Sequence, residues 1–315
     1  MVRNQDRQTS HFRIGVVSVS LHTPLRGLRK RYLSLYRQFE TDRPHEGEIR
    51  VDVRPNRFSP WHRRRYAVTV NGRLQFEPGR VDEILPHVDW AINWEVPRVM
   101  PEYLQLHASS MEVDGTGVIF PGQSGSGKST LTAGLLTRGW RYLCDEFALI
   151  HADTLDLHPY PRAICIKKPS YPVIESLGLM LHGNRHYWKG FKGSVGFINP
   201  VDAHPDAIGR ACPIRFVIFP KYREGAKPTL IPISRAEAAF ALHQVCFNLL
   251  SCQALGLDVL AAMIRGASCY RLTSGEIGAT CDLVESLVQG GASQRARSVT
   301  CSPAPSMPPP PSRGL

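Results

Sequence analysis

A stretch of nine residues, 122–130, reads GQSGSGKST and fits the pattern GxxxxGK[ST] of a phosphate-binding loop, or P-loop. An apolar run precedes it at 117–120 and another follows at 131–136, as expected for a strand before the loop and a helix after it. Glycines let successive backbone N–H groups point inward at phosphate oxygens, and the start of the helix adds a partial positive charge. The candidate nucleotide-binding residues are Gly122, Gln123, Ser124, Gly125, Ser126, Gly127, Lys128, Ser129 and Thr130.

Two side chains of this loop have a specific expected chemistry. Lys128 would reach the β- and γ-phosphates of a bound nucleotide, and the hydroxyl of Ser129 would bind Mg²⁺. The alternative interpretation is a flexible turn rich in glycine and serine. The strand, the lysine, the hydroxyl and the helix together favour the phosphate site.

A pair of acidic residues follows the loop at a short distance. Asp145 and Glu146 come directly after the apolar Leu143 and Cys144. One helix, ending near Gly139, and one turn would return the chain beside the P-loop strand, so we expect both carboxylates near the phosphates. In that place they would serve a metal ion or act as a base. The alternative is two surface carboxylates at the bend of a strand.

A third candidate is His107, which lies in the strand just before the P-loop strand. A lone histidine in a strand is more often a packed residue than a catalytic one. Spacing alone therefore favours a packing role for this side chain.

The elements that position these residues fall into an N-terminal unit, a central domain and a tail. Residues 1–100 have the pattern of a small α+β unit, and residues 101–290 that of an α/β domain built around the P-loop. Residues 291–315 are rich in proline, serine and glycine, which predicts a disordered tail. The elements expected in the N-terminal unit are a strand at 12–20, a helix at 25–39, a strand at 51–55, a hairpin at 66–78 around Asn71-Gly72, and a helix within 81–96.

The central domain shows strands early and helices late. Ser234 followed by Glu237 is a capping box and begins a helix predicted over 234–250. The other elements expected here are strands at 103–113, 115–122, 163–167, 216–220 and 229–233, a strand pair within 140–150, and helices at 129–138, 255–267 and 275–288.

Composition excludes several classes of protein. The chain has 315 residues, of which 43% are hydrophobic, as in a globular protein. Its apolar runs are far shorter than the roughly 20 residues that cross a bilayer, and the polar N-terminus lacks a signal-peptide core, so we expect a cytoplasmic protein with no membrane partner. The net charge is +11, but no basic segment carries the interleaved aromatic residues of a nucleic-acid-binding motif, so no nucleic acid is expected. The eight cysteines form no CxxC pair and predict reduced thiols in place of a zinc site.

Residues 106–150 resemble the core of the HPr kinase/phosphorylase superfamily, and most closely its divergent HPr kinase-related group. That core has a strand with a histidine, a turn, a strand, a loop of the form GxSGxGKS, a helix that ends in Arg-Gly, and a strand that ends in two acids. All of these occur here in the same order and at matching spacing. The runs at 214–222 and 231–242 also resemble that group.

The resemblance implies a nucleotide-binding fold shared with phosphoenolpyruvate carboxykinase. It also implies transfer of the γ-phosphoryl group of ATP to a serine hydroxyl of a protein or peptide that the sequence does not name. Carried over by position, Ser129 and Asp145 would hold Mg²⁺, the pair of Asp145 and Glu146 would supply the base, and His107 would lie close by. The related family forms oligomers, so a homo-oligomer is expected to be possible.

Three positions depart from the family pattern. Thr130 stands where the family has glutamate, and Glu146 stands where it usually has aspartate. The glycine-rich loop that the family uses in the phosphorylase direction carries an arginine, and the nearest stretch here, 191–200, has Lys192 instead. Phosphorylase activity is therefore not predicted.

Two other functions stay open at the level of sequence. One is a kinase of a small molecule with the same core, and the other is an ATPase, a GTPase or a nucleotide-sensing module without an acceptor. The chain has no LSGGQ-like segment of ABC-type ATPases and no NKxD-like motif for reading guanine. The acidic pair close after the P-loop favours a kinase.

Overall fold

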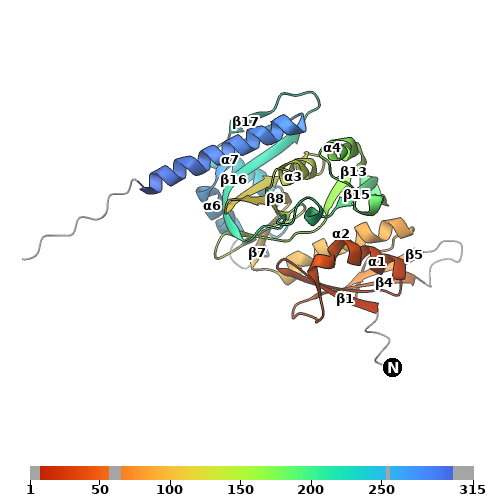
Figure 1. Ribbon diagram of the computed structural model, residues 1–315. Helices are drawn as coiled ribbons and strands as arrows, with labels where there is room; N and C mark the ends of the chain where they lie inside the picture. The colour runs from red at the N-terminus through yellow and green to blue at the C-terminus, as the bar shows by residue number, and fades with distance from the viewer. Residues whose placement is uncertain (1–7, 57–64, 253–255, 301–315) are drawn as a thin grey trace, which may run out of the picture.

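The computed structural model describes residues 8–56, 65–252 and 256–300 (Figure 1). It has a mixed α/β architecture with a six-stranded sheet near the N-terminus, a larger central sheet and a small third sheet. The P-loop lies between a strand and a helix of the central part. The predicted α/β class is therefore confirmed.

The N-terminal sheet has the strand order β3-β1-β2-β4-β5-β6. Its strands are β1 (Thr9–Ile14), β2 (Val17–His22), β3 (Glu40–Thr41), β4 (Ile49–Asn56), β5 (Arg65–Val70) and β6 (Arg73–Phe76). The hairpin predicted around Asn71-Gly72 joins β5 to β6, and both turn residues have positive φ, 48° and 79°. The single strand predicted at 12–20 was wrong, because the chain reverses at Gly15, which also has positive φ.

Two helices pack on this sheet, α1 (Arg26–Tyr36) and α2 (Val81–Val99). Figure 1 shows α2 between the N-terminal sheet and the small sheet of β13 (Ile164–Lys167), β14 (Tyr187–Trp188) and β15 (Ser194–Ile198). Contacts of α2 with β4 and β5 on one side and with β14 on the other agree with that view. The helix therefore links the N-terminal residues to the central part of the chain.

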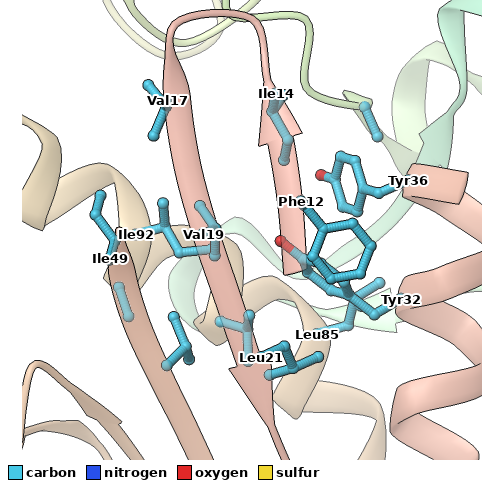
Figure 2. Packing of buried hydrophobic residues seen from close by; sticks show 14 of the residues in the cluster. Phe12, Ile14, Val17, Val19, Leu21, Tyr32, Tyr36, Ile49, Leu85 and Ile92 are labelled. Atoms are coloured by element: carbon cyan, nitrogen blue, oxygen red, sulfur yellow. The ribbon is translucent and has the colours of Figure 1, made fainter. Parts of the chain in front are cut away.

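A single buried cluster spans both parts of the molecule. Its N-terminal half brings together residues of β1, β2, β4, α1 and α2, including Phe12, Tyr32 and Ile92 (Figure 2). The rings of Phe12 and Tyr32 meet edge to face with 5.0 Å between centroids. Phe147 and Phe197 of the central part belong to the same cluster. Because this core is shared, the domain division near residue 100 stays a proposal.

The central sheet has the order β10-β8-β9-β16-β12-β11-β7, and β18 pairs with β16 and β17. Strands β9, β16 and β18 are parallel, so their carboxyl ends share one edge of the sheet. The strands are β7 (Tyr103–Leu106), β8 (Ala108–Val113), β9 (Thr116–Pro121), β10 (Arg141–Cys144), β11 (Ala148–His151), β12 (Asp156–His158), β16 (Cys212–Tyr222), β17 (Thr229–Pro232) and β18 (Ser268–Ser274). The strand β18 was missed by the sequence analysis.

Helices cover both faces of this sheet. On one face α3 (Lys128–Leu136) and α7 (Ile277–Thr300) pack on Val118 and Phe120 of β9, and α4 (Tyr171–Ser176) lies beside α3. On the other face α5 (Arg235–His243) and α6 (Gly256–Gly266) pack in the cluster that contains Ile119. Successive residues of β9 thus point to opposite cores, which explains why the P-loop strand is apolar throughout.

Two predicted helix boundaries differ from the structure. The helix predicted over 234–250 ends at His243, because the next segment pairs its backbone and Asn248 with β7. The capping role of Ser234 is confirmed, since its hydroxyl accepts a hydrogen bond from the Glu237 N–H. Helix α7 continues to Thr300, so residues 291–300 of the predicted disordered tail are helical. The rest of that tail, 301–315, lies outside the described residues.

Within the described ranges, no helix has the length and hydropathy of a membrane span.

Candidate functional site

The P-loop connects the end of β9 to the start of α3, as its sequence predicts. Gly125 and Gly127 have φ of 93° and 96°, a conformation that costs other residues conformational energy. A side chain at Gly122 would have its Cβ 2.8 Å from Ser126 Oγ. The glycines of the motif are therefore required by the backbone path of the loop.

Lys128 lies buried at the base of the loop. Its Nζ donates hydrogen bonds to the carbonyl oxygens of Gly122 and Gln123 at 2.5 and 3.0 Å. Burial lowers the pKa of Lys128, while the neighbouring Asp145 and Glu146 act in the opposite direction. The ammonium group is thus already positioned at the loop, on the wall of the cavity described below.

Asp145 and Ser129 are in direct contact. The Ser129 hydroxyl donates to Asp145 Oδ2 at 2.8 Å, and the buried Oδ1 has no hydrogen-bond partner in the described part of the chain. Burial and the neighbouring Glu146 raise the pKa of Asp145 to about 7, although Ser129 and Lys128 lower it. A buried carboxylate oxygen without a partner is costly, so this geometry fits a ligand that supplies positive charge.

The Ser129 hydroxyl and the Asp145 carboxylate suit a magnesium ion, which prefers carboxylate, hydroxyl and phosphate oxygens. Across the ranges that the structure describes, no three His, Cys, Asp or Glu side chains gather as a metal site. An ion at Ser129 and Asp145 would therefore need phosphate and water oxygens for its remaining ligands, as Mg²⁺ does in nucleotide sites. The two residues and the nucleotide would form one site together.

The acidic pair reaches this place by a different path from the predicted one. We expected its strand beside the P-loop strand, but β10 pairs with β8, and β8 lies between β10 and β9. Because β8 is antiparallel to both neighbours, β10 runs parallel to β9 and ends at the same edge of the sheet. Asp145 follows β10 and so meets Ser129, the second residue of α3.

Glu146 is directed into a group of charged side chains. Its carboxylate lies 3.5 Å from Lys189 Nζ, 3.6 Å from Lys192 Nζ and 3.7 Å from His107 Nε2. We call these four residues, His107, Glu146, Lys189 and Lys192, the acid–lysine cluster. Burial alone would raise the pKa of Glu146, but the two lysines and His107 lower it to about 2. The carboxylate is therefore ionised at neutral pH.

His107 connects this cluster to the P-loop. It lies between β7 and β8, and its carbonyl oxygen accepts a hydrogen bond from the Gly122 N–H at 3.2 Å. Burial and the charge of Lys128 lower the pKa of its imidazole to about 4, against the effect of Glu146. The ring is neutral at pH 7. The structure thus places a residue that spacing favoured as a packing histidine at the edge of the site.

The N-terminal residues also contribute to the acid–lysine cluster. The Nζ atoms of Lys189 and Lys192 lie 5.8 and 6.0 Å from the ring centroid of Trp90, which belongs to α2. Lys189 and Trp90 were not predicted from the sequence, and Lys192 was singled out there only as the residue that replaces an arginine of the family. Two lysines among the glycines of WKGFKG, 188–193, were the available signal.

A further lysine, Lys167, and the hydroxyl of Ser170 border the loop on the side of β13. Lys167 Nζ donates to Ser124 Oγ at 2.9 Å, and the Thr130 hydroxyl donates to Ser170 Oγ at 3.1 Å. Thr130, which stands where the family pattern has a glutamate, therefore faces the segment after β13. Lys167 was not predicted, and it adds positive charge beside the loop.

One cavity of about 920 Å³ joins these features. It is lined by the P-loop from Gly127 to Thr130, by Asp145 and Glu146, and by His107 and Lys192. A cavity of this size can hold a drug-sized ligand such as a nucleotide. The arrangement can therefore bind phosphates, hold a divalent cation and present a carboxylate to an incoming hydroxyl.

No protein-family model matches the chain. The HPr kinase/phosphorylase of Xanthomonas campestris pv. campestris (strain B100) is 35% identical over 111 residues, which make up 34% of this chain and 34% of that protein. The enzymes of the same name from Xanthomonas oryzae pv. oryzae (strain PXO99A) and Xylella fastidiosa (strain M12) are 37% identical over 89 and 86 residues, or 27% and 26% of each chain.

The chain is similar to HPr kinase/phosphorylases. The predicted resemblance to this family is confirmed, and the matched segment spans between about a quarter and a third of the length of these relatives. The solved Hpr(Ser) kinase/phosphatase of Coxiella burnetii is 17% identical with a TM-score of 0.31, over 61% of this chain and 98% of that one.

Proposed function

We propose that this protein is an ATP-dependent kinase that transfers the γ-phosphoryl group to a hydroxyl, a serine of a protein or peptide. The observation that carries the proposal is the cavity in which the P-loop, the bonded pair Ser129 and Asp145, and the carboxylate of Glu146 face the same space. A nucleotide sensor needs only the first two features. The charged group around Glu146 is the part that phosphoryl transfer requires.

The P-loop would bind the triphosphate through its backbone N–H groups and Lys128. Ser129 and Asp145 would hold Mg²⁺, which when bound offsets the negative charge that develops on the phosphates. Lys128 already lies in the loop and needs little rearrangement to reach a phosphate oxygen. These residues would bind and orient the nucleotide before the acceptor arrives.

Glu146 is the residue best placed to act as the base. Asp145 is buried and bonded to Ser129, whereas the Glu146 side chain is 28% exposed and lines the cavity. In the transfer, the acceptor oxygen forms a bond to the γ-phosphorus. The bond between the γ-phosphorus and the β–γ bridging oxygen breaks, and that oxygen leaves with ADP. The acceptor proton would pass to Glu146, while Lys192 and Lys128 stabilise the negative charge on the transferred group.

The net charge of the chain and the comparisons support a protein or peptide as the acceptor. The relatives are named for a kinase of HPr, and the net charge of +11 here suits an acidic partner. Trp90 of α2, in the N-terminal part of the chain, lies against the same lysines that surround Glu146. We propose that this side of the cavity receives the acceptor hydroxyl.

The decisive experiment is a transfer assay with Mg²⁺ and γ-labelled ATP, with and without an extract of the source cells. We expect a labelled protein band that is absent with Lys128→Ala and with Glu146→Gln. Lys168→Ala and Glu175→Gln are matched controls, because both residues are exposed and neither lines the cavity.

Three other results have a clear meaning. A labelled small molecule would replace the protein acceptor by a metabolite. Label released only as free phosphate would point to an ATPase. A labelled band that survives Lys128→Ala would contradict the proposed site.

A further inference from the structure

The cavity continues past the P-loop, away from the acid–lysine cluster. On this side it reaches the carboxyl ends of β16 and β18 and is lined by Tyr222, Glu224, Ser274 and Glu276. Because β9, β16 and β18 are parallel, the segments after all three strands meet at one edge of the sheet. Ligands of open α/β sheets bind outside such carboxyl ends. We call this region the β16–β18 end of the cavity.

Charge gives the direction of the bound nucleotide. Around and beyond the P-loop the cavity is lined by three lysines, Lys128, Lys167 and Lys192, which outnumber the two carboxylates there, whereas the β16–β18 end has two glutamates, Glu224 and Glu276. Glu276 accepts hydrogen bonds from the N–H groups of Gly278 and Ala279, which lower its pKa and keep it ionised. Phosphates are attracted to the lysines and repelled by the glutamates, so the uncharged nucleoside belongs at the β16–β18 end.

Tyr222 is the aromatic residue of this end. It is the last residue of β16 and is 52% exposed, although the middle of that strand is buried. Its backbone N–H donates to the carbonyl oxygen of Ser126 at 3.1 Å, and a Cβ at Gly127 would lie 3.2 Å from the Tyr222 Cβ. The backbone and Cβ of Tyr222 are therefore held beside the P-loop by the loop itself, and the residue lines the cavity.

The surrounding segments are fixed in place. Arg223 N–H donates to the Ser274 carbonyl oxygen at 2.9 Å, which ties the end of β16 to the end of β18. A Cβ at Gly275 would lie 1.8 Å from the Ala226 carbonyl oxygen, so the two loops touch at a position that only glycine can occupy. A preformed surface of this kind binds a ligand without the cost of ordering a loop.

We propose that Tyr222 is the platform on which the nucleoside base stacks while the P-loop holds the triphosphate. This inference rests on the proposed nucleotide site and assigns its base-binding end. An exposed aromatic ring stacks on the flat face of a base, and every base offers such a face. The platform therefore contributes affinity without selecting among bases.

The test compares two ligands, ATP and inorganic tripolyphosphate, both with Mg²⁺, by calorimetry. We expect Tyr222→Ala to weaken ATP about tenfold and to leave tripolyphosphate unchanged, because only ATP has a base. Tyr222→Phe should bind ATP as the wild type does. Phe240→Ala is the matched control, since Phe240 is exposed on α5 and does not line the cavity.

A second reporter avoids dependence on the alanine variant. In Tyr222→Trp, ATP should quench the fluorescence of the new indole, and tripolyphosphate should not. Unchanged ATP affinity in Tyr222→Ala would overturn the inference, as would an equal loss for both ligands, which would show that Tyr222 only supports the loop. Failure of the nucleotide site itself looks different, because Lys128→Ala would then leave the affinity for both ligands unchanged.

Discussion

The P-loop and the acid–lysine cluster line one cavity but are built in different ways. The P-loop is continuous in sequence, and its key bonds, such as those from Lys128 to Gly122 and Gln123, join residues a few positions apart. The acid–lysine cluster joins His107, Glu146 and two lysines from separate segments, and it leans on Trp90 of α2. The proposed phosphate site is thus built from local features of the chain, whereas the proposed acceptor side depends on the tertiary fold.

The electrostatics of the two acids follow the same contrast. Adjacent residues in the sequence, Asp145 and Glu146, have pKa values of about 7 and about 2. Asp145 is dominated by burial, with one oxygen that has no partner among the described residues. Glu146 is surrounded by cations that outweigh its burial. Two neighbouring carboxylates can therefore take different roles, one at the metal and one at the acceptor.

The largest effect is expected from a substitution that disrupts the acid–lysine cluster and leaves the P-loop unchanged. In Glu146→Gln the catalytic rate constant should fall by about 10²–10⁴, because the variant cannot accept the acceptor proton, while ATP affinity should stay within about twofold. Steady-state transfer and calorimetry measure the two quantities, with Glu175→Gln as the control. Full activity of Glu146→Gln would remove this residue from the mechanism.

A substitution in the P-loop should instead affect nucleotide binding. Lys128→Ala should weaken ATP binding by about a hundredfold, since two charge-assisted hydrogen bonds to phosphate oxygens are lost. Calorimetric titration with MgATP checks this, and Lys168→Ala should bind normally. An unchanged dissociation constant in Lys128→Ala would mean that the loop does not hold the phosphates.

A smaller effect is expected from Lys192, the lysine of the acid–lysine cluster that lines the same cavity as the P-loop. Lys192→Met should lower the catalytic rate constant about tenfold with little change in ATP affinity, because the lysine lies 3.6 Å from Glu146 and lines the cavity. The pH–rate profile gives an independent readout, since loss of this cation should raise the pKa of Glu146. A variant that loses ATP affinity and keeps its rate would place Lys192 in nucleotide binding instead.

The smallest expected effect concerns stability and pH. His107 has a folded-state pKa of about 4, below its ordinary 6.5, so the unfolded chain binds a proton more readily between these values. From this residue alone, stability should therefore fall by on the order of 1 kcal/mol as the pH drops from 7 to 5. Asp145 acts in the opposite direction in the same window, because its folded-state pKa of about 7 lies above its ordinary 3.8. Glu146 does not contribute in this window, because its stabilising effect is lost only below its ordinary pKa of 4.5.

The measurement for this prediction is urea unfolding at pH 7 and pH 5. Because Asp145 is present in both proteins, the difference between them isolates His107: on acidification, the unfolding free energy of His107→Gln should change more favourably than that of the wild type. Equal changes in the two proteins would show that the imidazole is not held neutral by the fold.

Several parts of the fold could be predicted because their signals are local. The hairpin at Asn71-Gly72 follows from two residues that accept positive φ, and the start of α5 follows from the bond between Ser234 and Glu237. Other parts could not. The reversal at Gly15 lies within a continuous apolar run, and the early end of α5 results from contacts of Asn248 with β7, far away in the sequence.

By itself, the sequence determined the place of the proposed phosphate site and which strand and helix hold the loop, because glycine conformations, a lysine and a helix start act over a few residues. Only the tertiary structure decided that β8 separates β10 from β9, that Lys189 and Lys192 surround Glu146, and that Tyr222 lies beside the P-loop. These contacts join distant segments. They depend on how sheets and helices pack, which a pattern of neighbouring residues does not predict.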